Sequence, residues 1–261
     1  MMNGANGSIK ISGSGSAGGG IYEEVKISGS GKITGDIECG EFSISGSGKA
    51  EGNVKASEFR TSGSSRVAGN LEAEEIKISG SSHIEGNVKC GSIKVSGSGN
   101  FDKDIDGEEV EISGSAKIGG NLHGESVRIS GGITINGDCE AEEFTAKGGF
   151  EIDGLLNADT IEIYVGGYCT AKEIGGENIQ VRELGSAGIW NKIISLFTIH
   201  GAGLKADVIE GDEIYLEYTT AKIVRGKNIT IGRGCNIDNV EYKEELLINE
   251  DGRVKNQVKI S

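Results

Sequence analysis

The sequence predicts an all-β fold: a single-stranded parallel β-helix, in which each coil is made of three short strands and the coils stack as a solenoid. The first observation is a seventeen-residue period that runs from Val25 to Thr160 without insertion or deletion. The second is that apolar residues recur at fixed positions of this period, with the two-residue spacing of a half-buried strand. The third is glycine at two further fixed positions, where we expect corners between strands.

The apolar positions define the strands. The repeats, whose positions are called columns 1 to 17, begin at Val25, Phe42, Phe59, Ile76, Ile93, Val110, Val127 and Phe144. Columns 1, 3, 9 and 13 are apolar in almost every repeat, and column 15 holds small residues. We therefore expect columns 1, 3, 9 and 13 to point inward, so that Ile33, Ile84 and Ile118 are buried. Stacking coils about 4.8 Å apart would join like strands in parallel ladders.

Glycine and polar columns mark the corners. Column 5 is glycine in all eight repeats, and column 11 is glycine in all but one, where Lys103 stands. We interpret these glycines as residues that adopt the positive φ of a tight corner. Column 12 is a ladder of turn-forming residues: Asp36, Asn53, Asn70, Asn87, Asp104, Asn121 and Asp138. Column 14 alternates in charge, which contributes roughly 0.2–1 kcal/mol for each stacked pair of opposite sign.

Less regular coils extend the pattern at both ends. Ile9 opens a sixteen-residue coil and Ile161 opens an eighteen-residue coil, and later coils open at Ile179, Ile214, Ile229 and Leu246. We expect residues 1–8 to be a short N-terminal tail and residues 9–261 to form one continuous β-helix of about thirteen coils. An apolar insertion at about residues 185–205, which holds the only tryptophan, interrupts the helix as a short helix or loop.

Composition limits the classes of partner. The formal net charge of −14 argues against nucleic-acid binding, which needs a basic surface, and against electrostatic docking on an anionic membrane. No apolar run reaches about 18 residues, so no transmembrane helix is expected, and the first residues lack the pattern of a secretory signal. Five scattered cysteines without a C-x-x-C pair fit a reducing compartment. We expect a cytoplasmic protein, with at most a weak peripheral contact to a membrane.

We find no pattern in the sequence for catalysis, cofactor binding or metal binding, so we predict that the protein is not an enzyme. The main enzymatic alternative is a hexapeptide-repeat β-helix, with a period of about 18 residues and histidine as base or zinc ligand. Here His83 and His123 fall in different columns, and the third histidine is His200. We interpret the cysteines as small core residues, since Cys39 and Cys90 of column 15 lie three coils apart, too far for a disulfide.

One motif resembles a known family. The pattern [IV]-x-G-[DN]-[ILV], as in residues 33–37 (ITGDI) and 84–88 (IEGNV), resembles the bactofilins, which are polymer-forming cytoskeletal proteins of bacteria. The resemblance covers roughly residues 9–181, and residues 223–232 resemble the longer bactofilin-like proteins of Gram-positive bacteria. It implies a right-handed, three-sided β-helix without enzymatic activity and a role in organising envelope, cell-shape or motility machinery.

Two hypotheses follow for function. The first is a self-assembling scaffold or filament subunit, because the open strand edges at the ends of a β-helix pair readily with another subunit. Its candidate assembly ends are Ile9, Ile11, Leu246 and Ile248. The second is a non-polymerising module that binds a protein partner, or a membrane weakly, through the insertion. Its candidate contacts are Ile189, Trp190, Ile193, Ile194, Leu196 and Phe197. The partners expected are the protein itself, another bactofilin-like protein, or an envelope or motility protein, with no nucleic acid and no cofactor.

Overall fold

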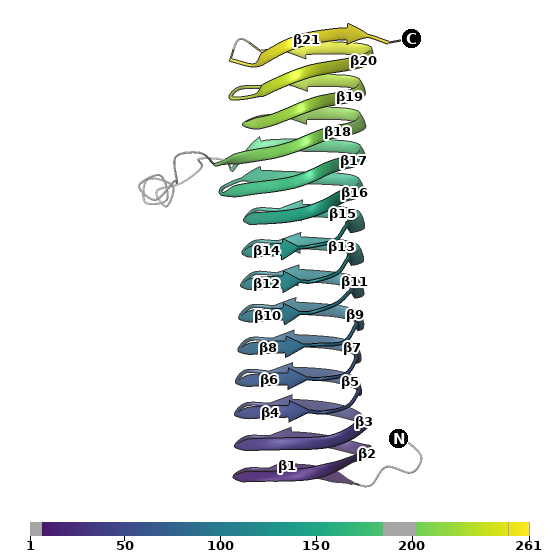
Figure 1. Ribbon diagram of the computed structural model, residues 1–261, viewed down its shortest axis with the longest axis vertical. Coiled ribbons are helices and arrows are strands. Elements are labelled where there is room, and N and C mark those ends of the chain that lie inside the picture. The colour runs from purple at the N-terminus through teal and green to yellow at the C-terminus, as the bar shows by residue number, and fades with distance from the viewer. Residues whose placement is uncertain (1–6, 185–201, 250, 261) are drawn as a thin grey trace. The chain divides into compact units, whose positions relative to one another are not determined.

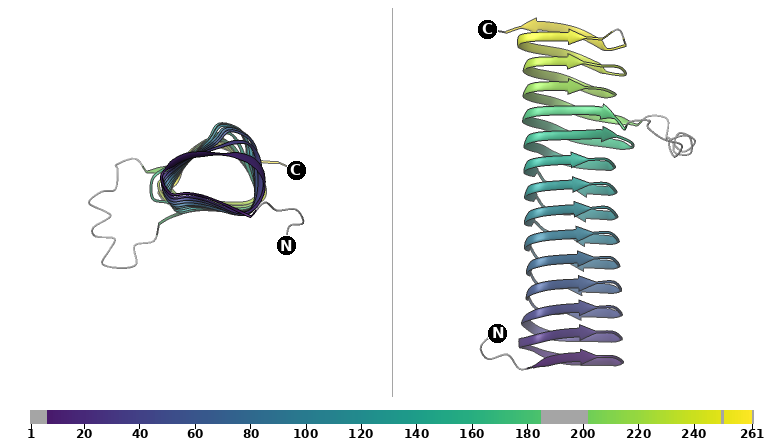
Figure 2. Two further views of the ribbon diagram at one scale, coloured as in Figure 1. Left: turned by 90° about the horizontal axis from the view of Figure 1, so that it is seen from below. Right: turned by 180° about the vertical axis from the view of Figure 1, so that it is seen from behind.

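The computed structural model describes residues 7–184, 202–249 and 251–260, and these ranges contain strands and no helix. The chain divides into two compact units, Met1–Glu125 and Ser126–Ser261, which we describe separately. In each unit the strands follow one another as turns of a coil and pair in parallel with the turns before and after (Figures 1 and 2). The predicted fold class, an all-β parallel β-helix, is therefore confirmed in both units.

The first unit holds twelve strands and the start of a thirteenth. These are β1 (Ser8–Ile11), β2 (Ser14–Ile27), β3 (Ser30–Ile44), β4 (Ser47–Ala50), β5 (Val54–Thr61), β6 (Ser64–Val67), β7 (Leu71–Ile78), β8 (Ser81–Ile84), β9 (Val88–Val95), β10 (Ser98–Phe101), β11 (Ile105–Ile112), β12 (Ser115–Ile118) and β13 (Leu122–Ile129). The strands of the second unit are β14 (Gly132–Ile135), β15 (Cys139–Ala146), β16 (Gly149–Val165), β17 (Tyr168–Glu183), β18 (Gly203–Leu216), β19 (Thr219–Ile231), β20 (Asn236–Ile248) and β21 (Arg253–Lys259).

The register of the first unit follows the sequence period. Val54 pairs with Leu71 and Phe59 with Ile76, in each case one full period apart. The first coil is shorter, with Ile9 paired to Val25. Within a long strand such as β5 the pairing omits column 16, so that columns 13–15 and columns 17–3 form separate runs. Together with columns 6–9 of the short strands, each coil has the three runs that the sequence predicts.

The core contains the predicted columns 1, 3, 9 and 13, the small residues of column 15 in most coils, and column 7. Every residue of columns 1, 3, 9 and 13 is at most 3% exposed, which confirms the predicted inward positions. Column 7 is also buried, although its residues range from glycine to phenylalanine. A Cβ added to Gly48 would lie only 2.8 Å from Ile44 of column 3, so the larger neighbour fills the space. Where column 3 is Ala146, column 7 holds Phe150, whose ring packs edge-on against Phe144 at 5.6 Å.

Most corner glycines are required by close stacking, so the sequence interpretation of a positive φ was wrong for them. Of the described column 5 and column 11 glycines, only Gly35 has a positive φ. A Cβ on Gly63 or Gly80 would instead lie 2.0 Å from the carbonyl oxygen of the column-5 glycine one coil earlier. Any side chain at this position would therefore push neighbouring coils apart.

The column-12 ladder joins one coil to the next. The side-chain oxygen of Asn53 accepts a hydrogen bond from the backbone N–H of Asn70 at 2.9 Å, and Asn70 accepts one from Asn87 at 2.9 Å. In return the backbone N–H of Val54 donates to the carbonyl of Asn70 at 2.8 Å. These bonds satisfy backbone groups that a corner would otherwise leave unpaired.

Coil length varies in the second unit while one core column continues. Ile161 pairs with Ile179, one residue beyond the regular period, and Ile179 pairs with Ile214, slightly more than two periods later. Ile214 then pairs with Ile229, two residues short of the period, and Ile229 pairs with Leu246, one full period later. The long interval before Ile214 contains residues 185–201, which lie outside the described ranges. The strands β17 and β18 therefore pair as neighbouring coils although residues 185–201 lie between them in the chain.

Candidate functional site at the ends of the coil stacks

The N-terminal edge is formed by β1, the outermost strand of its unit (Figure 1). β1 pairs with β2 through Ile9 and Val25 and through Ile11 and Ile27, which are residues of core columns 1 and 3. Val25 and Ile27 are fully buried, whereas Ile9 is 9% exposed and Ile11 is half-buried. The first coil thus presents a strand edge together with part of the apolar core.

The sequence analysis missed a third apolar residue at this edge, which belongs to the same coil as Ile9 and Ile11. Ile21 is 38% exposed and pairs with Glu38, which places it in the outward-facing column 14. It reaches this column because the register shifts by one residue between Gly18 and Gly20, where the sixteen-residue coil is one residue short. The short length of this coil is therefore the sequence feature that could have predicted the outward position of Ile21.

The C-terminal edge is formed by β21 and by the end of β20. β21 pairs with β20 from Asn236 to Tyr242, so that residues 245–248 pair with β19 alone. Leu246 is half-buried in column 1 and Ile248 is 40% exposed in column 3. The structure thus places the four predicted end residues at two strand edges, Ile9 and Ile11 at one and Leu246 and Ile248 at the other.

Two further apolar side chains at this end were not predicted. Leu247, in column 2, is 51% exposed, and Val258 of β21, in column 14, is 55% exposed. Their columns are polar or charged in most other coils. The alternation of the strand predicts that they point outward, but nothing in the local sequence shows that this coil has an uncovered edge.

The predicted contacts of the insertion, Ile189, Trp190, Ile193, Ile194, Leu196 and Phe197, lie outside the described residues, as does His200. The residues that precede the insertion are firmly held. Arg233 binds Glu183 at 2.7 Å, and the backbone N–H of Glu183 donates to Glu217 at 2.8 Å. Arg182 lies 4.7 Å above the ring of Tyr215. Residues 182 and 183 are therefore held against the two coils that follow them.

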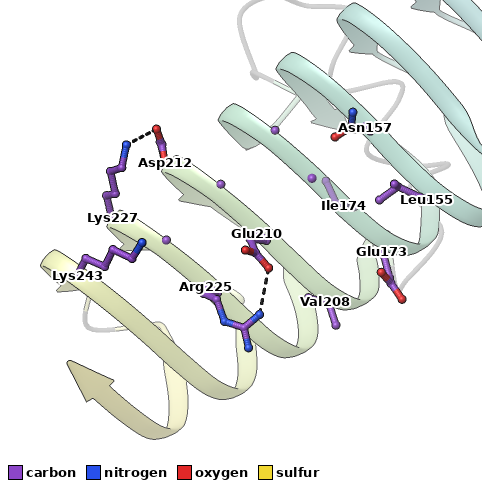
Figure 3. Close-up of a pocket in the computed structure, with 14 residues that line it drawn as sticks. Leu155, Asn157, Glu173, Ile174, Val208, Glu210, Asp212, Arg225, Lys227 and Lys243 are labelled. Atoms are coloured by element: carbon purple, nitrogen blue, oxygen red, sulfur yellow. Dashed lines mark hydrogen bonds and ion pairs between the residues drawn. The ribbon is translucent and has the colours of Figure 1, made fainter. Parts of the chain in front are cut away.

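A shallow groove of about 430 Å³ crosses β17, β18 and β19 in the second unit (Figure 3). Gly176 and Gly211 form part of its floor, and a Cβ on Gly211 would lie 2.5 Å from the carbonyl oxygen of Gly176. On its rim, Arg225 binds Glu210 at 3.0 Å and Glu241 of β20 at 2.7 Å. The hydrogen bonds to these two carboxylates raise the pKa of the Arg225 guanidinium, and the bond to Glu241 has the larger effect. The groove thus carries ion pairs that link one coil to the next, including that of Lys227 with Asp212.

Charged columns also link coils along the side faces. In column 14, Lys55 binds Glu72 of the next coil at 2.7 Å, and this carboxylate raises the pKa of Lys55. The predicted alternation of charge thus forms an ion pair between stacked coils here. Since both side chains are more than half exposed, such a pair contributes little to stability.

The histidines and cysteines take separate places. His83 contacts Asp102 at 3.0 Å and His123 contacts Asp106 at 3.4 Å, both on the surface. In the described ranges, no group of three or more histidine, cysteine or carboxylate side chains could hold a metal ion. All five cysteines are free and buried, which confirms their predicted place in the core. Burial raises the pKa of the Cys139 thiol to about 12, which makes it a poor nucleophile.

Comparisons with known proteins give a family. The family model described as "Bactofilin: Polymer-forming cytoskeletal" matches residues 3–102 and 59–140. The chain is 36% identical over 107 residues to the uncharacterized protein YhbF of Bacillus subtilis (strain 168), covering 41% of this chain and 42% of YhbF. It is 36% identical over 108 residues to the uncharacterized protein YhbE of the same organism, covering 41% of this chain and 43% of YhbE. The match therefore spans less than half the length of these relatives. No solved structure matches the chain, and within its described residues no helix is long and apolar enough to cross a membrane.

Proposed function

Because the chain belongs to the bactofilin family of polymer-forming cytoskeletal proteins, we propose that it is a structural subunit that assembles with copies of itself through its two open strand edges. The observation that carries the proposal is the pair of edges at β1 and at residues 245–248, where core columns 1 and 3 pair with a neighbouring strand on one side only in the described part of the chain. The family is structural, and the proposal gives the protein no catalytic role.

The physical reason lies in the unpaired backbone and the apolar surface of each edge. A strand edge presents N–H and C=O groups that another strand can pair with. Stacking a second subunit would also remove side chains such as Ile248 and Ile11 from water, at roughly 25 cal/mol for each Å² of apolar surface. The net charge of −14 opposes association, so assembly should strengthen as salt screens the repulsion.

In the cell, such an assembly would serve as a cytoplasmic scaffold that organises envelope, cell-shape or motility machinery. Its partners would be further copies of the protein, another bactofilin-like protein, or an envelope or motility protein. The family resemblance supports this role, while the strand edges support the self-association.

The test is to charge each edge. Ile11→Lys and Leu246→Lys place an ammonium in a core column at an edge, so each should abolish assemblies that sediment from the purified full-length protein. The controls are Ser12→Lys and Asn249→Lys, which add the same charge at exposed residues next to the edges. Circular dichroism would check that every variant remains folded. Equal sedimentation of Ile11→Lys, Leu246→Lys and the two controls would refute the proposal.

A further inference from the structure

We infer that Asn136 is a site of spontaneous deamidation, in which its side chain closes a ring with the backbone nitrogen of Gly137, and that the carboxylate formed there loosens the stacking of β14 on β16. The modification lies within the second unit and is independent of the proposed self-assembly. Water is its only co-reactant.

Asn136 combines the features that this reaction needs. It is exposed and lies in the corner between β14, which ends at Ile135, and β15, which begins at Cys139. Among the asparagines of the described ranges it alone precedes a glycine, which has no Cβ to hinder the approach of its backbone nitrogen to the side-chain amide. Its side chain makes no hydrogen bond to another described residue, so the amide can turn toward that nitrogen.

The asparagines of column 12 are protected by comparison. The side-chain oxygens of Asn53 and Asn70 each accept a backbone N–H of the next coil at 2.9 Å, which holds the amide away from its own backbone. The residues that follow them are Val54 and Leu71, whose side chains would crowd the ring. Ring closure depends on bringing two atoms of neighbouring residues together, so both differences favour reaction at Asn136.

The reaction balances with water alone. The Gly137 nitrogen attacks Cγ of Asn136, the new C–N bond forms, the bond from Cγ to Nδ2 breaks, and ammonia leaves with the proton of the Gly137 N–H. Water then opens the cyclic imide at either C–N bond. Opening at Cγ gives aspartate, and opening at the backbone carbonyl carbon gives isoaspartate, in which the main chain passes through Cγ. No atom is oxidised or reduced.

The new carboxylate breaks an alternation of charge in column 10. Asn136 follows Ile135, which pairs with Ile152, so Asn136 is stacked on Asp153. From that residue onward the charge changes sign at every coil, along Asp153, Lys172, Asp207, Lys222, Asp238 and Lys255. Two of these lysines bind the aspartate of the coil before, at 2.8 Å and 2.6 Å. A carboxylate at position 136 would be the first member of this column in the second unit to face a like charge.

Both products should weaken the contact between these two coils. Like charges stacked about 4.8 Å apart repel each other. Isoaspartate also lengthens the main chain by one atom, in a coil whose strands on both sides of the corner pair one full period away. The corner itself joins the coils, since the Gly154 N–H donates to the Gly137 carbonyl at 3.2 Å.

Peptide mapping by mass spectrometry tests the site. The purified full-length protein would be kept folded in mildly alkaline buffer, and aspartate and isoaspartate would be followed over time at Asn136 and Asn157. Asn157 is the internal control, because it is also exposed and precedes the small residue Ala158, but it lies within β16 and pairs with Gly175. Asn136 should react several-fold faster and yield both products. Equal rates at the two residues, or an unchanged amide at Asn136, would overturn the inference.

A comparison of variants tests the consequence. Asn136→Asp carries the charge of the product, Asn136→Ser is the neutral control, and Asn136→Asp combined with Asp153→Asn removes the like-charge pair. The urea midpoint of Asn136→Asp should lie below that of Asn136→Ser, by a difference that shrinks as salt screens the repulsion. The double variant should recover most of this difference. Equal midpoints for Asn136→Asp and Asn136→Ser at low salt would refute the loosened stacking.

Discussion

Gly80→Ala tests how closely the coils are stacked. Gly80 stands in column 5, where a Cβ would lie 2.0 Å from the carbonyl oxygen of Gly63. Gly13→Ala makes the same chemical change in the same column and sequence context, but in the first coil, where nothing lies within 4 Å of the added atom. The two variants therefore differ only in whether a coil lies beneath the substituted residue.

The expected cost can be worked from the corner. Ordinary van der Waals contact begins at 3.4 Å, so the Gly63 carbonyl and the new Cβ must separate by more than 1 Å. The hydrogen bond from Ser81 N–H to this same carbonyl, 2.8 Å long, would stretch with it. Overpacking of this kind costs about 1–3 kcal/mol, and a weakened hydrogen bond adds about 1 kcal/mol. Gly13→Ala should leave the free energy of unfolding unchanged or raise it by up to about 1 kcal/mol, because alanine lowers the conformational entropy of the unfolded chain.

Urea unfolding followed by circular dichroism, at protein concentrations too low for assembly, would measure both variants. The Gly80→Ala midpoint should fall well below that of the wild type, while the Gly13→Ala midpoint stays level or rises. Equal midpoints for the two variants would show that the glycine column does not serve close stacking.

Three further predictions concern the core, the thiols and the insertion. Ile112→Asp should cost several kcal/mol, because it leaves an unpaired charge in the core, whereas Ser113→Asp at the exposed neighbour should change the urea midpoint little. Cys139 should resist iodoacetamide at about pH 8 until the protein unfolds. Burial raises the pKa of the Cys139 thiol from 9.0 to about 12, so the stability that this thiol contributes is complete below pH 9 and is lost as the pH rises toward 12. The free energy of unfolding of Cys139→Ala should therefore fall less between pH 9 and pH 12 than that of the wild type. Replacing residues 186–201 by a short Gly–Ser linker should leave the circular dichroism spectrum and the urea midpoint unchanged, because the ladder between β17 and β18 is formed by residues outside this segment. A lower urea midpoint would show that the ladder depends on the segment.

The regular repeat made the fold predictable. A side chain that recurs once in every period of a stacked strand has to lie above its own copies, so columns 1, 3, 9 and 13 could be assigned inward from the sequence alone. Column 7 could not be assigned in this way, because its residue adapts to the one in column 3. Ala146 leaves room for Phe150, whereas Ile44 leaves room only for Gly48. The signal is thus a relation between two columns and not a property of either.

The ends were predictable in position but not in detail. The alternation of the last coil locates Leu246 and Ile248 in core columns, yet it cannot show that Leu247 and Val258 lie beside an uncovered edge. That depends on which coil has a neighbour, which is a property of the stack. The same limit applies to glycine, since a sequence cannot distinguish a residue chosen for a positive φ from one chosen because a carbonyl lies against it.

Electron microscopy of the purified protein, at high concentration and moderate salt, is the decisive measurement of self-assembly. We expect filaments or end-to-end oligomers one coil stack wide, which disappear with Ile11→Lys and persist with Ser12→Lys. A wild-type protein that stays strictly monomeric under these conditions, by microscopy and by sedimentation, would contradict it.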